Sequence, residues 1–144
     1  MYPVFKGQSH VFMVMPLPDG TCAVTFPDGD NWGEACGVKR AHATADAAFV
    51  ELFRVAKERK IKLTPIVEPS RSVASIAREI RRNWRNVYFG AVPYLDAMGS
   101  MDKASDPYGL DSGESILVYF LANANAYRGG LAKAHKEELK ALAK

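Results

Sequence analysis

The chain has 144 residues, of which 48% are hydrophobic, and it carries a net charge of +3. This length suits one ordinary domain or two very small ones, and the composition is typical of a folded protein rather than a disordered one. No apolar run approaches the roughly 18–20 residues that span a bilayer, so we expect no membrane segment. The N-terminus lacks signal-peptide features, and two cysteines are too few for a disulfide framework. We therefore expect a cytoplasmic protein with reduced thiols.

Residues 1–68 are predicted to form a ββ(β)α module. Residues 11–15 and 21–26 have strand patterns, and Pro16 to Gly20 between them has the composition of a turn. Residues 2–6 are expected to add an edge strand, 34–39 a third core strand and 61–63 a short returning strand. Thr44 is a candidate N-cap for a helix over 45–60, with Asp46 in its first turn. This helix is expected to bury a stripe of apolar residues against the sheet: Ala45, Ala48, Phe49, Leu52, Phe53 and Ala56.

Residues 69–144 are predicted to form a compact bundle of about four helices. The segment 64–70 carries two prolines and no helical pattern, so it is the expected boundary between the halves. Helices are predicted over 72–88, 91–98, from Asp111 as N-cap with Glu114 in capping-box spacing, and over 131–143. Gly129 and Gly130 are expected to end the third helix. The predicted fold class is α+β, with a small antiparallel sheet packed by one helix before the bundle, as two modules or one shared core.

Four arginines lie on one side of the predicted helix over 72–88: Arg78, Arg81, Arg82 and Arg85. Their spacing of i, i+3, i+4, i+7 is one face of a helix, and we call this group the basic face. The apolar residues lie on the other side: Val73, Ile76, Ala77, Ile80, Trp84, Val87 and Tyr88. All of the excess positive charge lies in residues 70–144, which carry eleven basic and eight acidic side chains. Such a face is suited to phosphates, to an acidic protein surface, or to water alone.

Further polar residues extend this candidate binding surface. Asn83 and Asn86 flank the arginines, and both are expected to donate to a nucleic-acid backbone or a base edge. In the last helix, Lys133, Lys136 and Lys140 are expected to assist, and Lys133 is in position to pair with Glu137 at i, i+4. His135 lies on the apolar side of that helix and is expected to be a satisfied core residue. Trp84 and Tyr88 are expected to be core residues rather than stacking platforms.

No short motif predicts catalysis or a cofactor. The cysteines, together with His10 or His42, do not have the spacing of a common zinc site. Asp28, Asp30 and Glu34 crowd one loop, as acidic residues do in turns, and Asp102, Asp106 and Asp111 miss the offsets of a calcium loop. No nucleophile elbow and no phosphate-binding glycine loop is present in the sequence. We therefore expect no metal, no cofactor and no enzymatic activity.

Three resemblances accompany these patterns. The runs NVYFGAVPYLDAM and YGLDSGESILVYFLANA in the second half resemble short helical proteins of phages and conjugative elements of gut Firmicutes. This resemblance implies a genomic setting rather than an activity. The opening YPV and the VTFPD strand are similar to HicB-type antitoxin domains, and GEACGVKRAHATADAAFVEL is similar to double-stranded-RNA-binding domains. Both of the latter concern fold, which does not carry function.

The leading hypothesis from the sequence is a non-catalytic accessory or regulatory protein of a phage or mobile element that binds nucleic acid through the basic face. The alternative is a protein-binding inhibitor of the anti-defence type, whose arginines meet an acidic surface on a host nucleoprotein. An enzyme without a recognisable motif is the third hypothesis. The partner is therefore nucleic acid or an acidic protein surface, and no membrane is expected.

Overall fold

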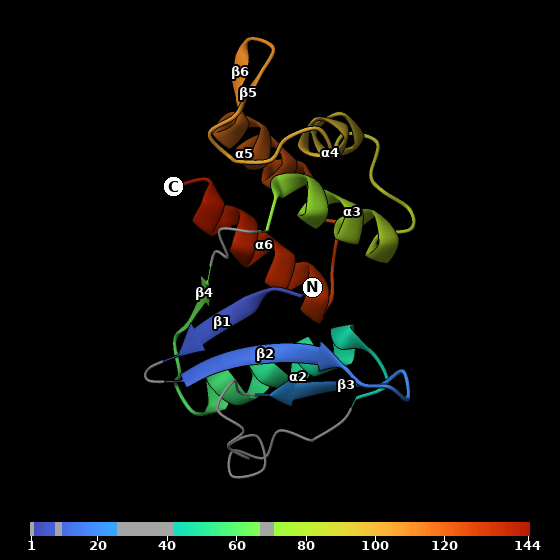
Figure 1. The fold of residues 1–144 in the computed structure, drawn as a ribbon, viewed down its shortest axis with the longest axis vertical. Coiled ribbons are helices and arrows are strands. Elements are labelled where there is room, and N and C mark those ends of the chain that lie inside the picture. Colours follow the sequence, from blue (N-terminus) through green and yellow to red (C-terminus); the bar gives the residue numbers. More distant parts are fainter. Residues whose placement is uncertain (1, 8–9, 26–41, 67–70) are drawn as a thin grey trace. The chain divides into compact units, whose positions relative to one another are not determined.

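The computed structural model of the chain describes residues 2–7, 10–25, 42–66 and 71–144 (Figure 1). Its first four strands form an antiparallel sheet in the order β3-β2-β1-β4. The strands are β1 (Val4–Gly7), β2 (His10–Pro16), β3 (Cys22–Thr25) and β4 (Leu63–Ile66). Helix α2 (Ala45–Glu58) covers one face of this sheet. The sheet with one helix across it confirms the predicted first half of the α+β fold.

The β2–β3 hairpin confirms the predicted turn chemistry. Pro16 pairs with Cys22, and Gly20 between them has a φ of +84°, a conformation that glycine adopts without a steric penalty. The Asp19 carboxylate accepts hydrogen bonds from the backbone N–H and the hydroxyl of Thr21, at 2.9 and 2.6 Å. These bonds favour the charged form and lower the pKa of Asp19. Proline, aspartate and glycine together therefore define the loop.

Two strand predictions are wrong in position. The segment 2–6 was expected at the edge, but β1 pairs with both β2 and β4 and is internal. The returning strand expected over 61–63 is instead β4, which begins at Leu63 and includes Pro65, within the segment expected to be the boundary between the halves. Because β4 pairs only with β1 in this sheet, its outer side needs no ladder donors, and an edge strand of this kind tolerates proline. The third core strand expected over 34–39 lies outside the described residues.

Helix α2 begins and packs as its sequence predicts. The Thr44 hydroxyl accepts from the Ala47 N–H at 3.2 Å as the N-cap. Apolar side chains of α2 pack on Phe5 and Phe12 of the sheet, and the Phe5 and Phe49 rings meet edge to face with centroids 6.2 Å apart. The predicted stripe is buried except for Phe53, which is half-buried beneath the ammonium of Lys133, 4.3 Å from its ring centroid.

The chain divides into two compact units. Unit 1 comprises residues 1–66 and 129–134, and unit 2 comprises 67–128 and 135–144. Helix α6 (Gly130–Leu142) contributes its first residues to unit 1 and the rest to unit 2. Unit 2 also holds α3 (Val73–Asn83), α4 (Val92–Met98) and α5 (Gly113–Asn123), with a two-stranded hairpin of β5 (Pro107–Tyr108) and β6 (Asp111–Ser112). Four helices thus follow the sheet, which confirms the second half of the predicted fold class.

The helix boundaries of unit 2 differ from prediction in three places. Helix α3 ends at Asn83 rather than near residue 88 because Trp84 leaves helical geometry and packs its ring on Tyr127 at 5.0 Å. The N-cap of α5 is Ser112 rather than Asp111, because the Ser112 hydroxyl accepts from the Ser115 N–H at 3.2 Å. The glycine pair does not end α5, which stops at Asn123; Gly130 instead begins α6. The apolar residues that recur at helical spacing in α5 and the segment after it are nevertheless buried: Ile116, Leu117, Phe120, Ala124 and Tyr127.

The start of α6 lies against the backbone of α2. The Leu131 N–H donates to the Asp46 carboxylate at 3.0 Å. A Cβ atom at Gly130 would contact the backbone nitrogen of Val50 and lie 2.9 Å from the carbonyl carbon of Phe49. Only a residue without a side chain fits so close an approach. Within the described part of the chain, no helix is long and apolar enough to cross a bilayer.

Gly130→Ala is therefore expected to lower the free energy of unfolding by about 1–3 kcal/mol, because the backbone of α2 has to move to admit the methyl group. Chemical denaturation followed by circular dichroism measures the change. Gly99→Ala at the exposed end of α4 adds the same methyl in ordinary helical geometry and is expected to stay within about 0.5 kcal/mol of wild type. Equal effects of the two changes would contradict this account of Gly130.

Candidate nucleic-acid interface

Helix α3 carries most of the basic face. The Ser72 hydroxyl caps the helix by accepting from the Ser75 N–H at 3.1 Å. The apolar side of the helix, with Ile76 and Ile80, is buried in unit 2, and the arginines lie on the exposed side. Arg78, Arg81 and Arg82 belong to the helix, whereas Arg85 follows its end. The prediction of four arginines on one helix is therefore wrong for Arg85, although its side chain is exposed like the other three.

The arginines of the basic face differ in their partners. Arg81 forms an ion pair with Asp96 of α4, in which both side chains are about half exposed. Such an exposed pair contributes about 0–1 kcal/mol. Among the described residues, no carboxylate lies within ion-pairing distance of the exposed residues Arg78, Arg82 and Arg85. These three guanidinium groups are consequently available to a ligand. The acids 28, 30 and 34 of the first half lie outside the described residues.

The three lysines predicted to assist the arginines each have a contact of their own in the structure. Lys133 belongs to unit 1 and lies over the ring of Phe53. Lys136 is half-buried, donates to the Tyr127 carbonyl at 2.5 Å, and has a pKa lowered by burial and by the nearby cations Lys140 and Arg128. Lys140 pairs with Glu137 at 2.9 Å, so Glu137 takes that partner rather than the predicted Lys133. Asn86 is exposed beside Arg85.

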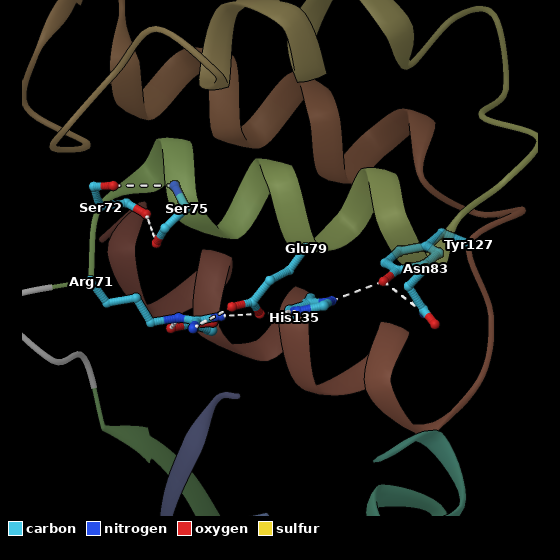
Figure 2. Close-up of polar contacts among 8 residues, drawn as sticks. Arg71, Ser72, Ser75, Glu79, Asn83, Tyr127 and His135 are labelled. Atoms are coloured by element: carbon cyan, nitrogen blue, oxygen red, sulfur yellow. Dashed lines mark hydrogen bonds and ion pairs between the residues drawn. The ribbon is translucent and has the colours of Figure 1, made fainter. Parts of the chain in front are cut away.

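Behind the basic face, α3 is tied to the rest of unit 2 by a chain of polar side chains (Figure 2). Asn83 donates to the Tyr127 hydroxyl at 3.0 Å, and that hydroxyl lies 2.8 Å from Nδ1 of His135. Nε2 of His135 lies 3.1 Å from the Glu79 carboxylate. Arg71 closes the chain with two hydrogen bonds to the same carboxylate, at 2.9 and 2.6 Å. His135 is fully buried and satisfied, as its sequence position predicted.

Donors and acceptors along this chain point in one direction. Burial lowers the pKa of His135, and the positive charge of Arg71 acts in the same sense, against the hydrogen bond to Glu79. Neutral His135 then donates a hydrogen bond from Nε2 to Glu79 and accepts a hydrogen bond from the Tyr127 hydroxyl at Nδ1. Tyr127 in turn accepts from Asn83. Burial raises the pKa of Glu79, but the bonds from His135 and Arg71 outweigh it and bring the value down to about 2. Glu79 is thus the anion on which the chain ends.

Arg71 lies between two carboxylates. Besides its bonds to Glu79, its Nε lies 2.6 Å from Oε1 of Glu138, and the Arg71 and Glu138 side chains are 5% and 2% exposed. The second oxygen of Glu138 makes no hydrogen bond with the described residues. One guanidinium cannot neutralise both carboxylates, and Glu79 holds the better geometry. Burial therefore raises the pKa of Glu138 to about 7 in spite of its contact with Arg71.

Sequence reasoning missed this chain and one exposed aromatic pair. The sequence from Arg71 to Arg85 holds five arginines and one acid, Glu79, and Asn83 was expected to donate to a ligand beside them. Nothing local reports a partner such as His135, 56 residues from Glu79. The expectation that Tyr88 lies in the core is wrong, because it is 43% exposed beside Phe89, which is 79% exposed. Trp84 is buried as predicted.

The remaining candidate sites concern metal ions, the acidic loop near Asp106 and the thiol of Cys22. In the described part of the chain, no group of three or more histidine, cysteine or acidic side chains is placed to hold a metal ion. Asp106 accepts from the N–H groups of Asp102 and Lys103, at 3.0 and 2.7 Å, which is a turn contact. Cys22 is buried with a free thiol, and burial raises its pKa.

No family model, curated protein or solved structure matches this chain. The resemblances to mobile-element proteins, to HicB-type domains and to RNA-binding domains therefore stay predictions. Function has to be argued from the residues of this chain.

Tyr127→Phe is expected to lower the free energy of unfolding by about 1–3 kcal/mol, because it removes the hydroxyl between Asn83 and the buried His135. Thermal and chemical denaturation measure the loss. Tyr94→Phe is the matched control, since the Tyr94 hydroxyl makes no hydrogen bond among the described residues. Equal stability of the two variants would show that the polar chain does not hold α3.

Glu138→Gln is expected to change the pH dependence of stability. The folded-state pKa of Glu138 lies above its ordinary value of 4.5, at about 7. The stability that its proton contributes is therefore complete below pH 4.5 and lost as the pH rises through about 7. Glutamine does not titrate in this range. The free energy of unfolding of the variant, relative to that of wild type, is therefore expected to rise by about 2–3 kcal/mol from about pH 5 to about pH 8. A difference between the two proteins that does not change with pH in urea titrations would contradict the assignment.

Proposed function

We propose that unit 2 binds the phosphate backbone of a nucleic acid through the exposed arginines at α3. The observation that carries the proposal is the contrast among the arginines. Arg54 and Arg71 each contact two carboxylates and Arg81 contacts one, whereas Arg78, Arg82 and Arg85 have no such partner among the described residues. Three cations without a carboxylate partner in the described part of the chain form a site to which a polyanion adds without displacing an ion pair there.

The phosphates of a nucleic acid are ligands that suit these guanidinium groups. A guanidinium presents a planar fork that forms two parallel hydrogen bonds to a phosphate, and each neutralised phosphate releases condensed counterions. Asn86, exposed next to Arg85, adds amide donors. The polar chain behind α3 keeps the helix, and with it the spacing of Arg78 and Arg82, fixed before binding. This pre-organisation lowers the entropy lost on association.

The absence of a catalytic motif in the sequence and the resemblance of its second half to mobile-element proteins favour an accessory or regulatory role. In that role the protein occupies nucleic acid rather than altering it chemically. An acidic surface on a host nucleoprotein, as in an anti-defence inhibitor, is the alternative that the same charges allow. The two differ in what a binding titration shows. Phosphate binding favours an oligonucleotide over an acidic peptide of equal charge.

Arg78→Ala with Arg82→Ala is expected to weaken oligonucleotide binding roughly tenfold or more at about 50 mM salt, because two charge-assisted contacts are lost. The slope of log affinity against log salt is expected to become shallower by about 1–2 units. Fluorescence anisotropy at several salt concentrations measures both. Lys57→Ala with Lys62→Ala removes the same charge from exposed positions of unit 1 and is expected to change neither strongly.

Two results would overturn the proposal. One is undetectable binding of wild type to both duplex and single strands at low salt. The other is an equal loss in the arginine pair and the lysine pair, which would mean that net charge alone matters. Arg82 lies in the last turn of α3, where its positive charge interacts favourably with the helix dipole. The stability of each variant is therefore measured before its binding.

A further inference from the structure

Two aromatic rings project to solvent directly after the basic face. Tyr88 and Phe89 follow Arg85 and Asn86 in the segment between α3 and α4. Phe89 is 79% exposed and Tyr88 is 43% exposed, and their ring centroids lie 4.6 Å apart at 54°. An apolar ring exposed to this extent gives up the free energy of burial that it would gain in a core. Its position shortly after guanidinium groups that have no carboxylate partner among the residues the structure describes is the feature that requires an explanation.

The structure holds these rings at the surface. The Tyr88 and Phe89 carbonyls accept from the N–H groups of Ala91 and Val92, at 2.8 and 3.3 Å, and so form the turn that begins α4. A Cβ atom at Gly90 would lie 2.6 Å from Cε1 of Tyr88, so that ring lies against the glycine backbone. The backbone that carries the two rings is therefore held by its own turn, and the Tyr88 ring lies against Gly90.

A second aromatic pair continues this surface across α4 and α5, which pack on each other (Figure 1). The Tyr94 and Tyr119 rings lie 5.5 Å apart, and Tyr119 is 47% exposed. Asn123 links the two pairs. Its side-chain oxygen would lie 3.0 Å from a Cβ at Gly90, beside Tyr88, and its amide donates to the Tyr119 carbonyl at 2.9 Å. Unit 2 thus presents aromatic rings from three successive segments, and the first of these rings follows Arg85 by three residues in the chain.

We propose that the nucleic acid taken by unit 2 is single-stranded, with unpaired bases stacked on Phe89 and Tyr88 and the adjoining phosphates held by Arg85 and Arg82. This inference rests on the proposed function and specifies its ligand. Only an unpaired base offers an open face to a protein ring, since the faces of duplex bases are covered by their neighbours. A duplex contacts the guanidinium groups but makes no stacking contact with the rings, and the same holds for an acidic peptide.

Phe89→Ala is the direct test because a side chain exposed to this degree is dispensable for folding. The probes are a fluorescent DNA strand and an RNA strand of about 16 nucleotides, each alone and as its duplex, together with an oligoglutamate peptide. We expect Phe89→Ala to weaken single-strand binding about 5- to 100-fold, from the loss of one stacked base. Its salt slope stays as in wild type, because no phosphate contact is removed.

Two controls separate stacking from loss of apolar surface. Phe89→Tyr keeps an aromatic face and is expected to bind as wild type does. Leu110→Ala removes another fully exposed apolar side chain of unit 2, at the tip of the β5–β6 hairpin, and is expected to have no effect. A loss in Phe89→Ala that Phe89→Tyr restores and Leu110→Ala does not share supports stacking on the ring.

The outcomes distinguish this inference from the proposed function. Wild-type preference for duplex, or single-strand affinity of Phe89→Ala equal to wild type, overturns the stacking role while the arginine pair still reports phosphate binding. No binding of any oligonucleotide at about 50 mM salt overturns both. Tighter binding of the oligoglutamate peptide than of either strand also overturns both and favours an acidic protein partner.

Discussion

The Glu79 carboxylate is the point at which three segments of unit 2 meet. Arg71 from the chain before α3 donates to it twice, His135 from α6 donates once, and Glu79 itself is part of α3. An anion in a site this enclosed is stable only when such donors surround it. Removing one donor therefore leaves the Glu79 charge with fewer hydrogen bonds and weakens the link between α3 and α6. The further links to Tyr127 and Asn83 extend the same constraint along one turn of α3.

This constraint sorts the arginines of the chain by function. Arg71 is consumed inside by two carboxylates, and Arg81 is partly satisfied at the surface by Asp96. Arg78 and Arg82 lie on α3 and Arg85 follows its end, and none of the three pairs with a carboxylate among the described residues. The polar contacts on the opposite side of α3 fix how the helix is rotated about its axis. Because α3 stops at Asn83 and the chain then turns into α4, two exposed rings begin three residues after the last of these arginines. Charged and aromatic side chains therefore follow one another within one short segment of the chain.

Much of the fold follows from local sequence patterns, whereas the interactions that define the candidate site do not. Helical periodicity places Ile76, Ile80 and Phe120 in the core, and proline with glycine defines the β2–β3 turn, because these effects act within a few residues. The end of α3 was misplaced because the stacking of Trp84 on Tyr127 overrides a helical pattern. The salt-bridged role of Glu79 depends on residues distant in sequence, and the exposure of Phe89 depends on where α3 ends. A lone acid among five arginines was the available signal for the former, and the latter had none.

The most direct measurement of the central claim is a titration of isotope-labelled protein with a single-stranded oligonucleotide, followed by amide chemical shifts in NMR spectra. The account predicts that shifts concentrate between Arg78 and Phe89 and extend to α4 and α5 near Tyr94 and Tyr119. It also predicts that the sheet and α2 of unit 1 are little affected. Shifts confined to unit 1, or an unchanged spectrum at low salt with excess oligonucleotide, would contradict the claim that the exposed arginines and rings of unit 2 form the binding surface.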